Sequence, residues 1–185
     1  MPAALEREIK LRFDSPEGAR AAVIEAGATP LRGRRLQEDC LLDTADDQLR
    51  LRRSALRVRM ESGKSLLTFK GPVQPSAMKV REELETMVGD GTLMLRILEE
   101  LGLHVWFRYQ KYREEFALED VVVAIDETPV GTFVEIEGGE RGIAVLAEAL
   151  GRKPTDYLVE SYRSLFVRYC EERGLPPTHM LFDDE

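Results

Sequence analysis

Acidic and basic side chains alternate along the start of the chain in a spacing that suits phosphate and metal chemistry. In an extended strand successive side chains point to opposite faces, so Glu6, Glu8 and Lys10 would share one face. Two carboxylates and an ammonium group placed in this way resemble half of a site for a metal-bound phosphate. A half-exposed strand with ordinary alternating charges would look the same. The recurrence of this pattern in later segments favours the site.

The later segments add further charges that share a face within each segment. These are Arg57 and Arg59, Lys70, Arg81, Glu83 and Glu85, Lys111 and Arg113, Asp126, and Glu135 and Glu137. Lys and Arg from several strands can surround phosphate oxygens. Carboxylates in an all-oxygen setting suit Mg²⁺ or Mn²⁺, which bind carboxylates and substrate phosphates together. The two sets predict a site for a metal-bound phosphate chain, with Arg12, Glu61 and Glu82 as surface or rim charges.

Short strands separated by turn signals must position these residues. Strands are predicted at about 5–13, 34–44, 55–61, 66–70, 79–87, 104–116, 120–127 and 130–137. Helices are predicted at about 16–25, 93–101, 141–150 and 160–173. The first helix has the clearest start, because Ser15 can cap it and Pro16 suits its first turn. One domain is expected over 1–175, followed by an acidic, frayed tail over 176–185.

The arrangement of the strands follows from their two faces. An open sheet with its charged face in water would account for the alternation. Many antiparallel strands with few helices would then leave long unprotected edges, which closure into a barrel removes. If the sheet closes with the helices outside, the charged face becomes the interior. That interior must be wet and hold a polyanion with cations, because burying so many charges without water is prohibitive. An α+β fold is therefore predicted, with a closed antiparallel β-barrel and helices packed outside.

Composition narrows the class of protein. The chain has 185 residues and a formal net charge of −8, which argues against binding nucleic acid through a global basic field. It has no apolar run long enough to cross a bilayer. The presence of only two histidines, His104 and His179, argues against a histidine-based zinc site or a Ser-His-Asp triad. Cys40 and Cys170 are read as free thiols of a cytoplasmic protein. The sequence leaves the oligomeric state open, a dimer included.

The charged motifs, taken in order, resemble those of a known family. They are Glu6-x-Glu8-x-Lys10, Leu56-Arg57-Val58-Arg59, Leu67-Thr68-Phe69-Lys70, Arg81-x-Glu83-x-Glu85, Lys111-x-Arg113, Asp126 and Glu135-Ile136-Glu137. This order resembles the CYTH superfamily, the triphosphate tunnel metalloenzymes, over about 6–137, and 158–165 is similar to the closing helix of that family. The resemblance implies eight strands around a charged tunnel. Its members include thiamine triphosphatases, inorganic tripolyphosphatases and class IV adenylyl cyclases.

The resemblance also implies roles for individual residues. The triphosphate would be bound by Arg57, Arg59, Lys70, Arg81, Lys111 and Arg113. The metal that bridges to the substrate, Mg²⁺ or Mn²⁺, would be held by Glu83, Glu85, Asp126, Glu135 and Glu137. Glu6, Glu8 and Lys10 are the predicted catalytic group. The two acids would bind a second metal or orient a metal-activated water, while Lys10 would act at one end of the phosphate chain.

Metal-dependent hydrolysis of a small-molecule triphosphate is the predicted function, with inorganic tripolyphosphate or an organic triphosphate such as thiamine triphosphate as substrate. A class IV adenylyl cyclase, which makes cyclic AMP and pyrophosphate from ATP, is the alternative. The cyclase branch often carries a His-Phe pair before the first motif, and only 1–5 precede Glu6 here, which favours hydrolysis. A non-catalytic polyphosphate or nucleotide sensor ranks third, because Glu6 and Glu8 are both present.

Aromatic side chains on the tunnel face could stack on an organic group of the substrate. Tyr109, Phe107 and Phe133 have the required alternation, whereas Trp106 falls on the opposite face of its strand. Plain packing of the barrel would explain these aromatics equally well. Inorganic tripolyphosphate is therefore the expected substrate by default.

Overall fold

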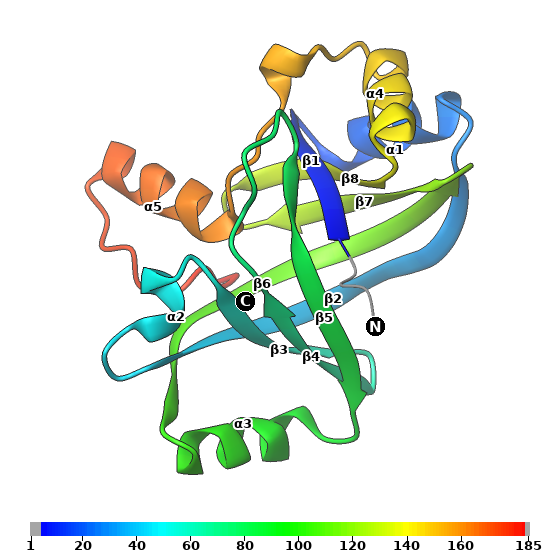
Figure 1. Cartoon of the computed structure of the whole chain (residues 1–185). Helices are drawn as coiled ribbons and strands as arrows, with labels where there is room; N and C mark the ends of the chain where they lie inside the picture. The colour runs from blue at the N-terminus through cyan, green and yellow to red at the C-terminus, as the bar shows by residue number, and fades with distance from the viewer. Residues whose placement is uncertain (1–4, 184–185) are drawn as a thin grey trace.

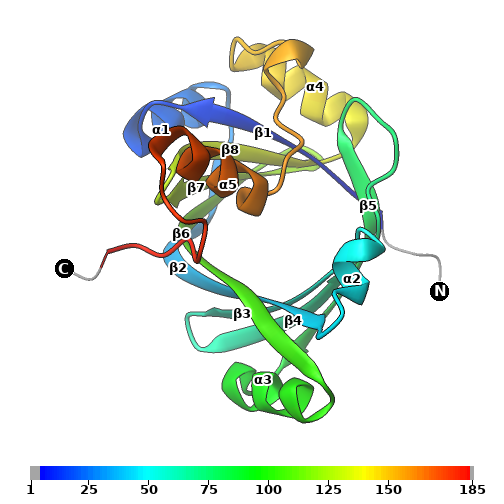
Figure 2. The same ribbon diagram turned by 90° about the vertical axis from the view of Figure 1, so that its left-hand side faces the viewer.

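Eight antiparallel strands close into a barrel in the computed structural model, which describes residues 5–183 (Figure 1 and Figure 2). Around the barrel their order is β1-β5-β4-β3-β2-β6-β7-β8, and β8 pairs with β1 to close it. The strands are β1 (Leu5–Phe13), β2 (Thr29–Thr44), β3 (Ala55–Glu61), β4 (Lys64–Lys70), β5 (Lys79–Val88), β6 (Leu103–Leu118), β7 (Val121–Thr128) and β8 (Gly131–Gly138). The predicted fold class is confirmed.

The helices lie around the barrel (Figure 2), and the last one also lines its interior with Tyr162, Arg163 and Ser164. The helices are α1 (Pro16–Glu25), α2 (Gln48–Leu51), α3 (Gly91–Glu100), α4 (Glu140–Ala149) and α5 (Tyr162–Arg173), with a 3₁₀ turn, η1 (Pro154–Asp156). Ser15 caps α1 as expected, since its Oγ accepts a hydrogen bond of 3.1 Å from the Gly18 amide. None of the helices in the described part of the chain is long and apolar enough to cross a membrane.

The hydrophobic cores lie between the barrel and these helices, two of them on its outer face and the one beneath α5 on inward-facing side chains of β6 and β8. The largest joins β1, β7 and β8 to α1 and α4, with Ile9, Val123 and Ile136 fully buried against Val23 and Ile143. A second core joins β6 to α5, and a third packs α3 against β2, β3 and β6. Because the apolar face of each strand is used on the outside, its charged face is directed into the barrel.

The two longest strands, β2 and β6, pair irregularly. Their register shifts between Pro30 and Arg32, between Arg32 and Arg35, and between Leu41 and Leu42 of β2. Each shift inserts an extra residue into one strand and interrupts the simple alternation of side chains. Strand β2 also begins at Thr29, earlier than the predicted residue 34. Alternation alone therefore misassigns some side chains of these two strands.

The segment after α5 is packed against the barrel as far as the structure describes it. Met180 is fully buried, its amide donates to the Arg108 carbonyl at 3.0 Å, and its carbonyl accepts from the Gln110 amide at 2.9 Å. Phe182 packs on Tyr112 with ring centroids 5.2 Å apart. The expectation of a frayed tail over 176–185 is wrong for this part, because Met180 supplies backbone hydrogen bonds to a stretch of β6 that β7 does not reach. Residues 184–185 lie outside the described residues.

Candidate functional site

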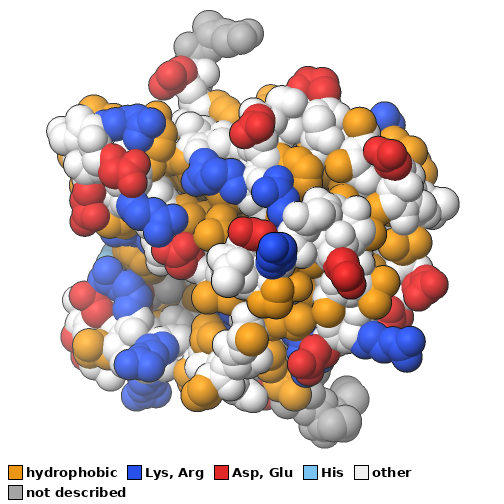
Figure 3. Space-filling view, turned by 90° about the horizontal axis from the view of Figure 1, so that it is seen from above, with side chains coloured by type: hydrophobic (Ala, Val, Ile, Leu, Met, Phe, Trp, Pro, Cys, Tyr) orange, Lys and Arg blue, Asp and Glu red, His pale blue; other side chains and the backbone are white. Residues whose placement is uncertain are grey.

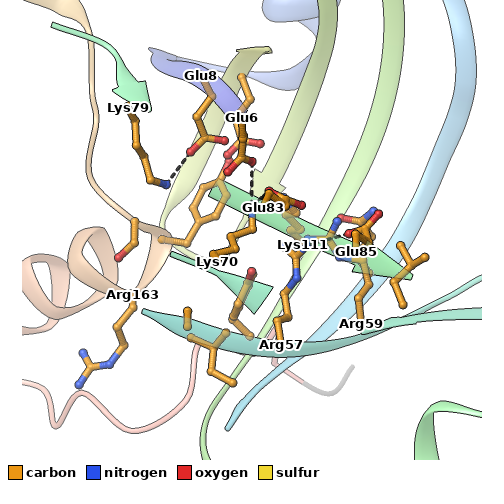
Figure 4. Close-up of a pocket in the computed structure, with 18 of the residues that line it drawn as sticks. Glu6, Glu8, Arg57, Arg59, Lys70, Lys79, Glu83, Glu85, Lys111 and Arg163 are labelled. Carbon is orange, nitrogen blue, oxygen red and sulfur yellow. Dashed lines mark hydrogen bonds and ion pairs between the residues drawn. The ribbon is translucent and has the colours of Figure 1, made fainter. Parts of the chain in front are cut away.

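The interior of the barrel is a cavity of about 670 Å³, a size typical of small-molecule sites. The predicted site residues that line it are Glu6, Glu8, Lys10, Arg57, Arg59, Lys70, Arg81, Glu83, Glu85, Lys111, Arg113, Glu135 and Glu137. Asp126 is the one predicted residue behind the wall, fully buried and 2.9 Å from Nζ of Lys111. The strands thus bring the predicted cations and carboxylates together around one space (Figure 4).

The first acidic pair is held by four basic side chains, from β1, β4 and β5. Glu6 accepts hydrogen bonds from Nζ of Lys70 at 2.7 Å and from Nε of Arg81 at 3.2 Å. Glu8 lies 3.0 Å from Nζ of Lys10 and 2.5 Å from Nζ of Lys79. Burial opposes ionisation of Glu8, but the charges of Lys10 and Lys79 outweigh it and hold the pKa of the carboxyl well below its usual range.

Carboxylates also crowd one another at this end of the first strand. Although the Glu137 side chain is exposed, the surrounding protein, together with Glu6, Glu8 and Glu83, raises its pKa to about 7. Burial and the neighbouring Glu8 also raise the pKa of Glu6, despite its contact with Lys70. No ion pair is formed by Glu137 with any residue of the described chain. Repulsion of this kind is relieved by a cation.

These acidic side chains suit a divalent metal ion by their chemistry and charge, but not by their arrangement. Oxygen donors that repel each other match the preference of Mg²⁺ and Mn²⁺ for carboxylate ligands, so the donor set fits in chemistry and charge. Within residues 5–183, however, no three acidic, histidine or cysteine side chains are arranged to hold a metal ion. The carboxylates form ion pairs with lysine and arginine side chains instead. A metal ion would therefore have to replace these side chains as the partner of the carboxylates.

A second charged group lies deeper, where β6, β7 and β8 meet α5. Asp126 accepts from Nζ of Lys111 at 2.9 Å, from both sides of the Arg113 guanidinium and, at 2.6 Å, from the hydroxyl of Tyr162. Glu135 pairs with Arg113 and, at 3.0 Å, with Lys10. Burial opposes ionisation of Asp126, but Arg113 and Lys111 lower the pKa of its carboxyl. Burial and the Arg113 charge lower the pKa of Lys111 to about 8.

A third group, on β2 and β3, contains the predicted arginines. Arg59 forms a two-pronged hydrogen bond with Asp39, at 2.8 and 3.1 Å. Arg57 is held more loosely: its nearest carboxylate oxygens, on Asp39 and Glu85, are 3.5 Å away. Its Nε is buried without a hydrogen-bond acceptor in the described structure. Arg57 also donates to the Thr68 hydroxyl at 3.2 Å, and among the arginines of this group it is the one that lines the cavity without a close carboxylate partner.

One sequence prediction about this region is wrong. Glu61 was expected at the surface or rim, but it is 4% exposed and lines the cavity. It accepts hydrogen bonds from Arg32 at 2.7 Å, Arg35 at 3.1 Å and Gln37 at 2.5 Å. Simple alternation along β3 already places Glu61 on the face of Arg57 and Arg59, and the bulges in β2 turn Arg32 and Arg35 to the same side, so that both reach its carboxylate. These side chains close one end of the tunnel.

Sequence reasoning also missed two buried charges in the cavity wall. Lys79 shares the face of Arg81 by simple alternation, so the same signal identifies it. Burial and the Lys10 charge lower its pKa to about 8. Asp39, which pairs with Arg59, could be found in the same way once β2 is aligned with β3.

The predicted aromatics divide between cavity and core. Tyr109 lines the cavity, whereas Phe107 and Phe133 are fully buried in the core beneath α5. Trp106, expected to point away, lines the cavity at the end opposite Glu61. The register shift at Leu41 and Leu42 places Trp106 as the extra residue of β6.

Comparison with known proteins agrees with this geometry. The family model described as CYTH domain matches residues 4–155. A protein of Methanocaldococcus jannaschii named "Putative adenylate cyclase" is 31% identical over 134 residues, which cover 72% of this chain and 76% of that protein.

Two solved structures share the fold. One, from Vibrio parahaemolyticus and described as a "putative adenylate cyclase", superposes with a TM-score of 0.78 at 19% identity, covering 89% of this chain and 99% of that one. The other, an adenylyl cyclase-like protein from Hippeastrum, gives a TM-score of 0.65 at 21% identity over 92% and 97% of the two chains. The family match and the curated relative, together with the closed barrel, establish that the chain belongs to the CYTH domain family.

Proposed function

We propose that this protein hydrolyses a triphosphate inside the barrel with the help of a divalent metal ion. The observation that carries the proposal is the convergence of thirteen Lys and Arg side chains and eight carboxylates on one internal cavity. So many cations around one cavity can bind the oxygens of a linear polyanion. The carboxylates among them can bind a metal ion that accompanies the polyanion. The protein of Hippeastrum, whose structure shares this fold, is described as having a dominant triphosphatase activity, which adds support.

The basic side chains would bind the phosphate oxygens. Arg57, with its unpaired Nε, can donate without losing a close partner, whereas Arg59 and Arg113 are already bound by carboxylates. Lys70, Arg81 and Lys111 extend the cationic surface. Because each of these groups comes from a strand of a closed barrel, their positions are fixed before the substrate arrives, which favours catalysis by preorganised charge.

The acidic side chains that surround the first part of β1 would hold the metal. Glu6, Glu8, Glu83 and Glu137 repel one another, and of these Glu137 has no cationic partner in the described structure. A divalent cation bound there would neutralise charge on the phosphate oxygens during in-line displacement. Asp126, Glu85 and Glu135 would serve chiefly to orient the neighbouring Lys and Arg side chains, since each already contacts one of them.

Lys10 and Glu8 would position the attacking water and the terminal phosphate. Lys10 lies between Glu8 and Glu135, 3.0 Å from each, and it is nearly inaccessible to solvent. Burial opposes its charge, but the two carboxylates raise its pKa, so it stays an ammonium and can donate to a phosphate oxygen. Glu8, held ionised, can accept a hydrogen bond from water.

A class IV adenylyl cyclase is the second candidate. The names of the Methanocaldococcus jannaschii relative and of the Vibrio parahaemolyticus structure favour it. In that reaction the ribose hydroxyl of ATP attacks the innermost phosphorus and pyrophosphate leaves. The same charged interior could serve either reaction, so the products decide between them.

Phosphorus NMR of the purified protein with Mg²⁺ or Mn²⁺ tests the proposal. Tripolyphosphate, thiamine triphosphate and ATP are supplied in separate reactions. Release of orthophosphate with a diphosphate product is the expected result. Pyrophosphate and cyclic AMP from ATP would assign the protein to the cyclases. Tight binding in calorimetry with no turnover of any of the three would indicate a sensor.

A further inference from the structure

Trp106 lies at the open end of the cavity, where a β-bulge turns it out of the regular alternation of β6. Leu41 pairs with Phe107 and the next residue of β2, Leu42, pairs with Val105, so Trp106 is the extra residue between them. Bulges beside functional sites commonly redirect one side chain in this way. As a result, the only Trp of the chain faces the cavity instead of the outer core.

Two guanidinium groups lie against the indole ring. The Arg50 Cζ is 4.3 Å from the ring centroid of Trp106, and the Arg163 Cζ is 5.6 Å from it and 5.1 Å from that of Phe107. We call Arg50, Trp106 and Arg163 together the tunnel mouth. Figure 4 shows Arg163 standing apart from the charged cluster around Glu6 and Lys70. The tunnel mouth is therefore a separate surface, built of flat groups.

The hydrogen-bond donors of the tunnel mouth are not fully used. Arg163 forms no ion pair with any residue in the described chain, and its Nε and Nη1 are buried without an acceptor. Burial and the charge of Arg50 lower its pKa. Arg50 pairs with both Asp43 and Asp47, and the Asp43 carboxylate also accepts three backbone amide hydrogen bonds at the start of α2. The unpaired positive charge and the unused donors of the tunnel mouth therefore belong to Arg163.

The tunnel mouth joins the cavity to an outer groove of about 400 Å³. Arg50, Trp106, Arg163 and Ser164 line both spaces. The far end of the tunnel is closed instead by the hydrogen bonds of Glu61 to Arg32 and Arg35. A group attached to a phosphate chain in the cavity would thus lie at the tunnel mouth.

We propose that the tunnel mouth binds a neutral heteroaromatic ring carried by the triphosphate, so that the substrate is a nucleoside triphosphate. This inference rests on the proposed function and narrows its substrate. Indole and guanidinium planes both stack on nucleobases, and the ring nitrogens and carbonyls of a base accept hydrogen bonds from guanidinium groups. A positively charged ring, such as the thiazolium of thiamine, would be repelled by Arg163, whose guanidinium has no carboxylate partner in the described chain. Inorganic tripolyphosphate would leave the tunnel mouth unfilled.

The test compares kcat/KM for ATP, tripolyphosphate and thiamine triphosphate in matched variants. Trp106→Leu should lower the value for ATP by roughly 10- to 100-fold, mainly through KM, because it removes the stacking surface. The value for tripolyphosphate, which does not reach this ring, should change far less. Trp106→Phe keeps a π-face and should retain most of the activity with ATP. Tyr169→Leu is the control for loss of an aromatic ring, because Tyr169 packs against the same core beneath α5 but does not line the cavity.

Several outcomes overturn the inference. Equal losses of kcat/KM with ATP and tripolyphosphate in Trp106→Leu would mean that the indole ring only supports the packing of the barrel. No loss with either substrate would likewise mean that the ring does not bind a base. Turnover of thiamine triphosphate as efficient as that of ATP would contradict the expected repulsion of a positively charged ring at the tunnel mouth. If the unaltered protein hydrolyses tripolyphosphate but not ATP, the proposed function stands and this inference fails. If it hydrolyses none, the proposed function fails, and the ratio of Kd values for ATP between the two Trp106 variants, measured by calorimetry, decides the inference.

Discussion

At the scale of single residues, Glu8 has the most demanding environment in the barrel. It lies against two buried ammonium groups, those of Lys10 and Lys79, at 3.0 and 2.5 Å, and their charges keep its pKa low although the side chain is buried. A carboxylate kept charged in this way can bind a metal ion or hold a water molecule without first losing a proton.

Replacing Glu8 by Gln should abolish metal-dependent turnover while leaving the barrel folded. The amide cannot serve as an anionic ligand, and loss of a group of this kind costs at least about 10- to 100-fold in metal affinity or activity. Steady-state kinetics, with circular dichroism to check folding, measures the effect. Glu82→Gln is the matched control, because Glu82 is on the neighbouring strand but does not line the cavity. Near-normal turnover in Glu8→Gln would remove this residue from the catalytic group.

Arg57→Ala should weaken substrate binding more than it slows the chemical step. A charge-assisted hydrogen bond contributes roughly 1.5–3 kcal/mol, which corresponds to about 10- to 150-fold in Kd. Calorimetry with tripolyphosphate measures this change, and Arg20→Ala, on the outer surface of α1, is the control. Unchanged KM and kcat would place Arg57 outside the phosphate path.

Glu137 provides a test by pH. Its pKa is raised from the ordinary 4.5 to about 7 in the folded protein, so the folded state binds this proton more tightly than the unfolded chain. The stability that it contributes is complete below pH 4.5 and is lost as the pH rises through 7. In metal-free buffer, Glu137→Gln should therefore be the more stable form at pH 8, and this advantage should vanish near pH 4.

The size of this effect is limited by the exposure of the side chain. We expect less than about 1 kcal/mol, or roughly 2–4 °C in Tm. Thermal unfolding at several pH values, followed by circular dichroism with a chelator present, measures it. A constant difference between the two proteins from pH 4 to pH 8 would contradict the assignment.

At the scale of elements, regular alternation accounts for most of the site. It placed Glu6, Glu8 and Lys10 in the interior from β1, and Arg81 and Glu83 from β5, because these strands pair without a register shift. Once the barrel closes, the alternate residues on one face of each strand all point into the same interior, so the face of a single charged residue identifies the others. This explains why both the fold class and the charged lining could be predicted from the sequence.

The failures fall where the strands are irregular or where no strand forms. Trp106 was misplaced because the bulge of β6 is not marked by any local sequence signal. Glu61 is the exception, since it shares the face of Arg57 and Arg59 on the regular strand β3, and alternation alone places it in the cavity. Met180 was assigned to a frayed tail because a segment with polar neighbours gives no sign of the β6 edge that it covers. Such contacts depend on the tertiary arrangement, which local patterns do not encode.

We propose that the domain continues past residue 175 through this covering segment. Met180→Ala should then lower the free energy of unfolding by about 2–5 kcal/mol, since a fully buried Met loses its packing against Phe107 and α5. Urea denaturation measures the change. Leu181→Ala is the matched control, because that side chain is 41% exposed and should change stability little. Equal small effects in both variants would return the segment to a loosely attached tail.

At the scale of the whole molecule, the positive charges that would bind the ligand lie inside the barrel and not on its outer surface. The chain carries 34 acidic against 26 basic residues, and Figure 3 shows both signs interspersed over the face seen from above. Long-range attraction therefore contributes little to capturing a polyanion, and the affinity must come from cations held inside the barrel. Those cations are held at present by carboxylates, so a phosphate chain with its metal would replace one set of ion pairs with another.

This exchange predicts that ligand binding stabilises the entire barrel. At about 100 times its Kd, tripolyphosphate with Mg²⁺ should contribute roughly 2.7 kcal/mol, which raises Tm by about 5–10 °C for a chain of this length. Differential scanning calorimetry at several ligand concentrations measures the rise. Lys111→Met removes a buried cation of the cavity and should lose most of it, whereas Arg96→Gln, on the exposed face of α3, should keep it. A rise of equal size in both variants would mean that the anion binds outside the barrel.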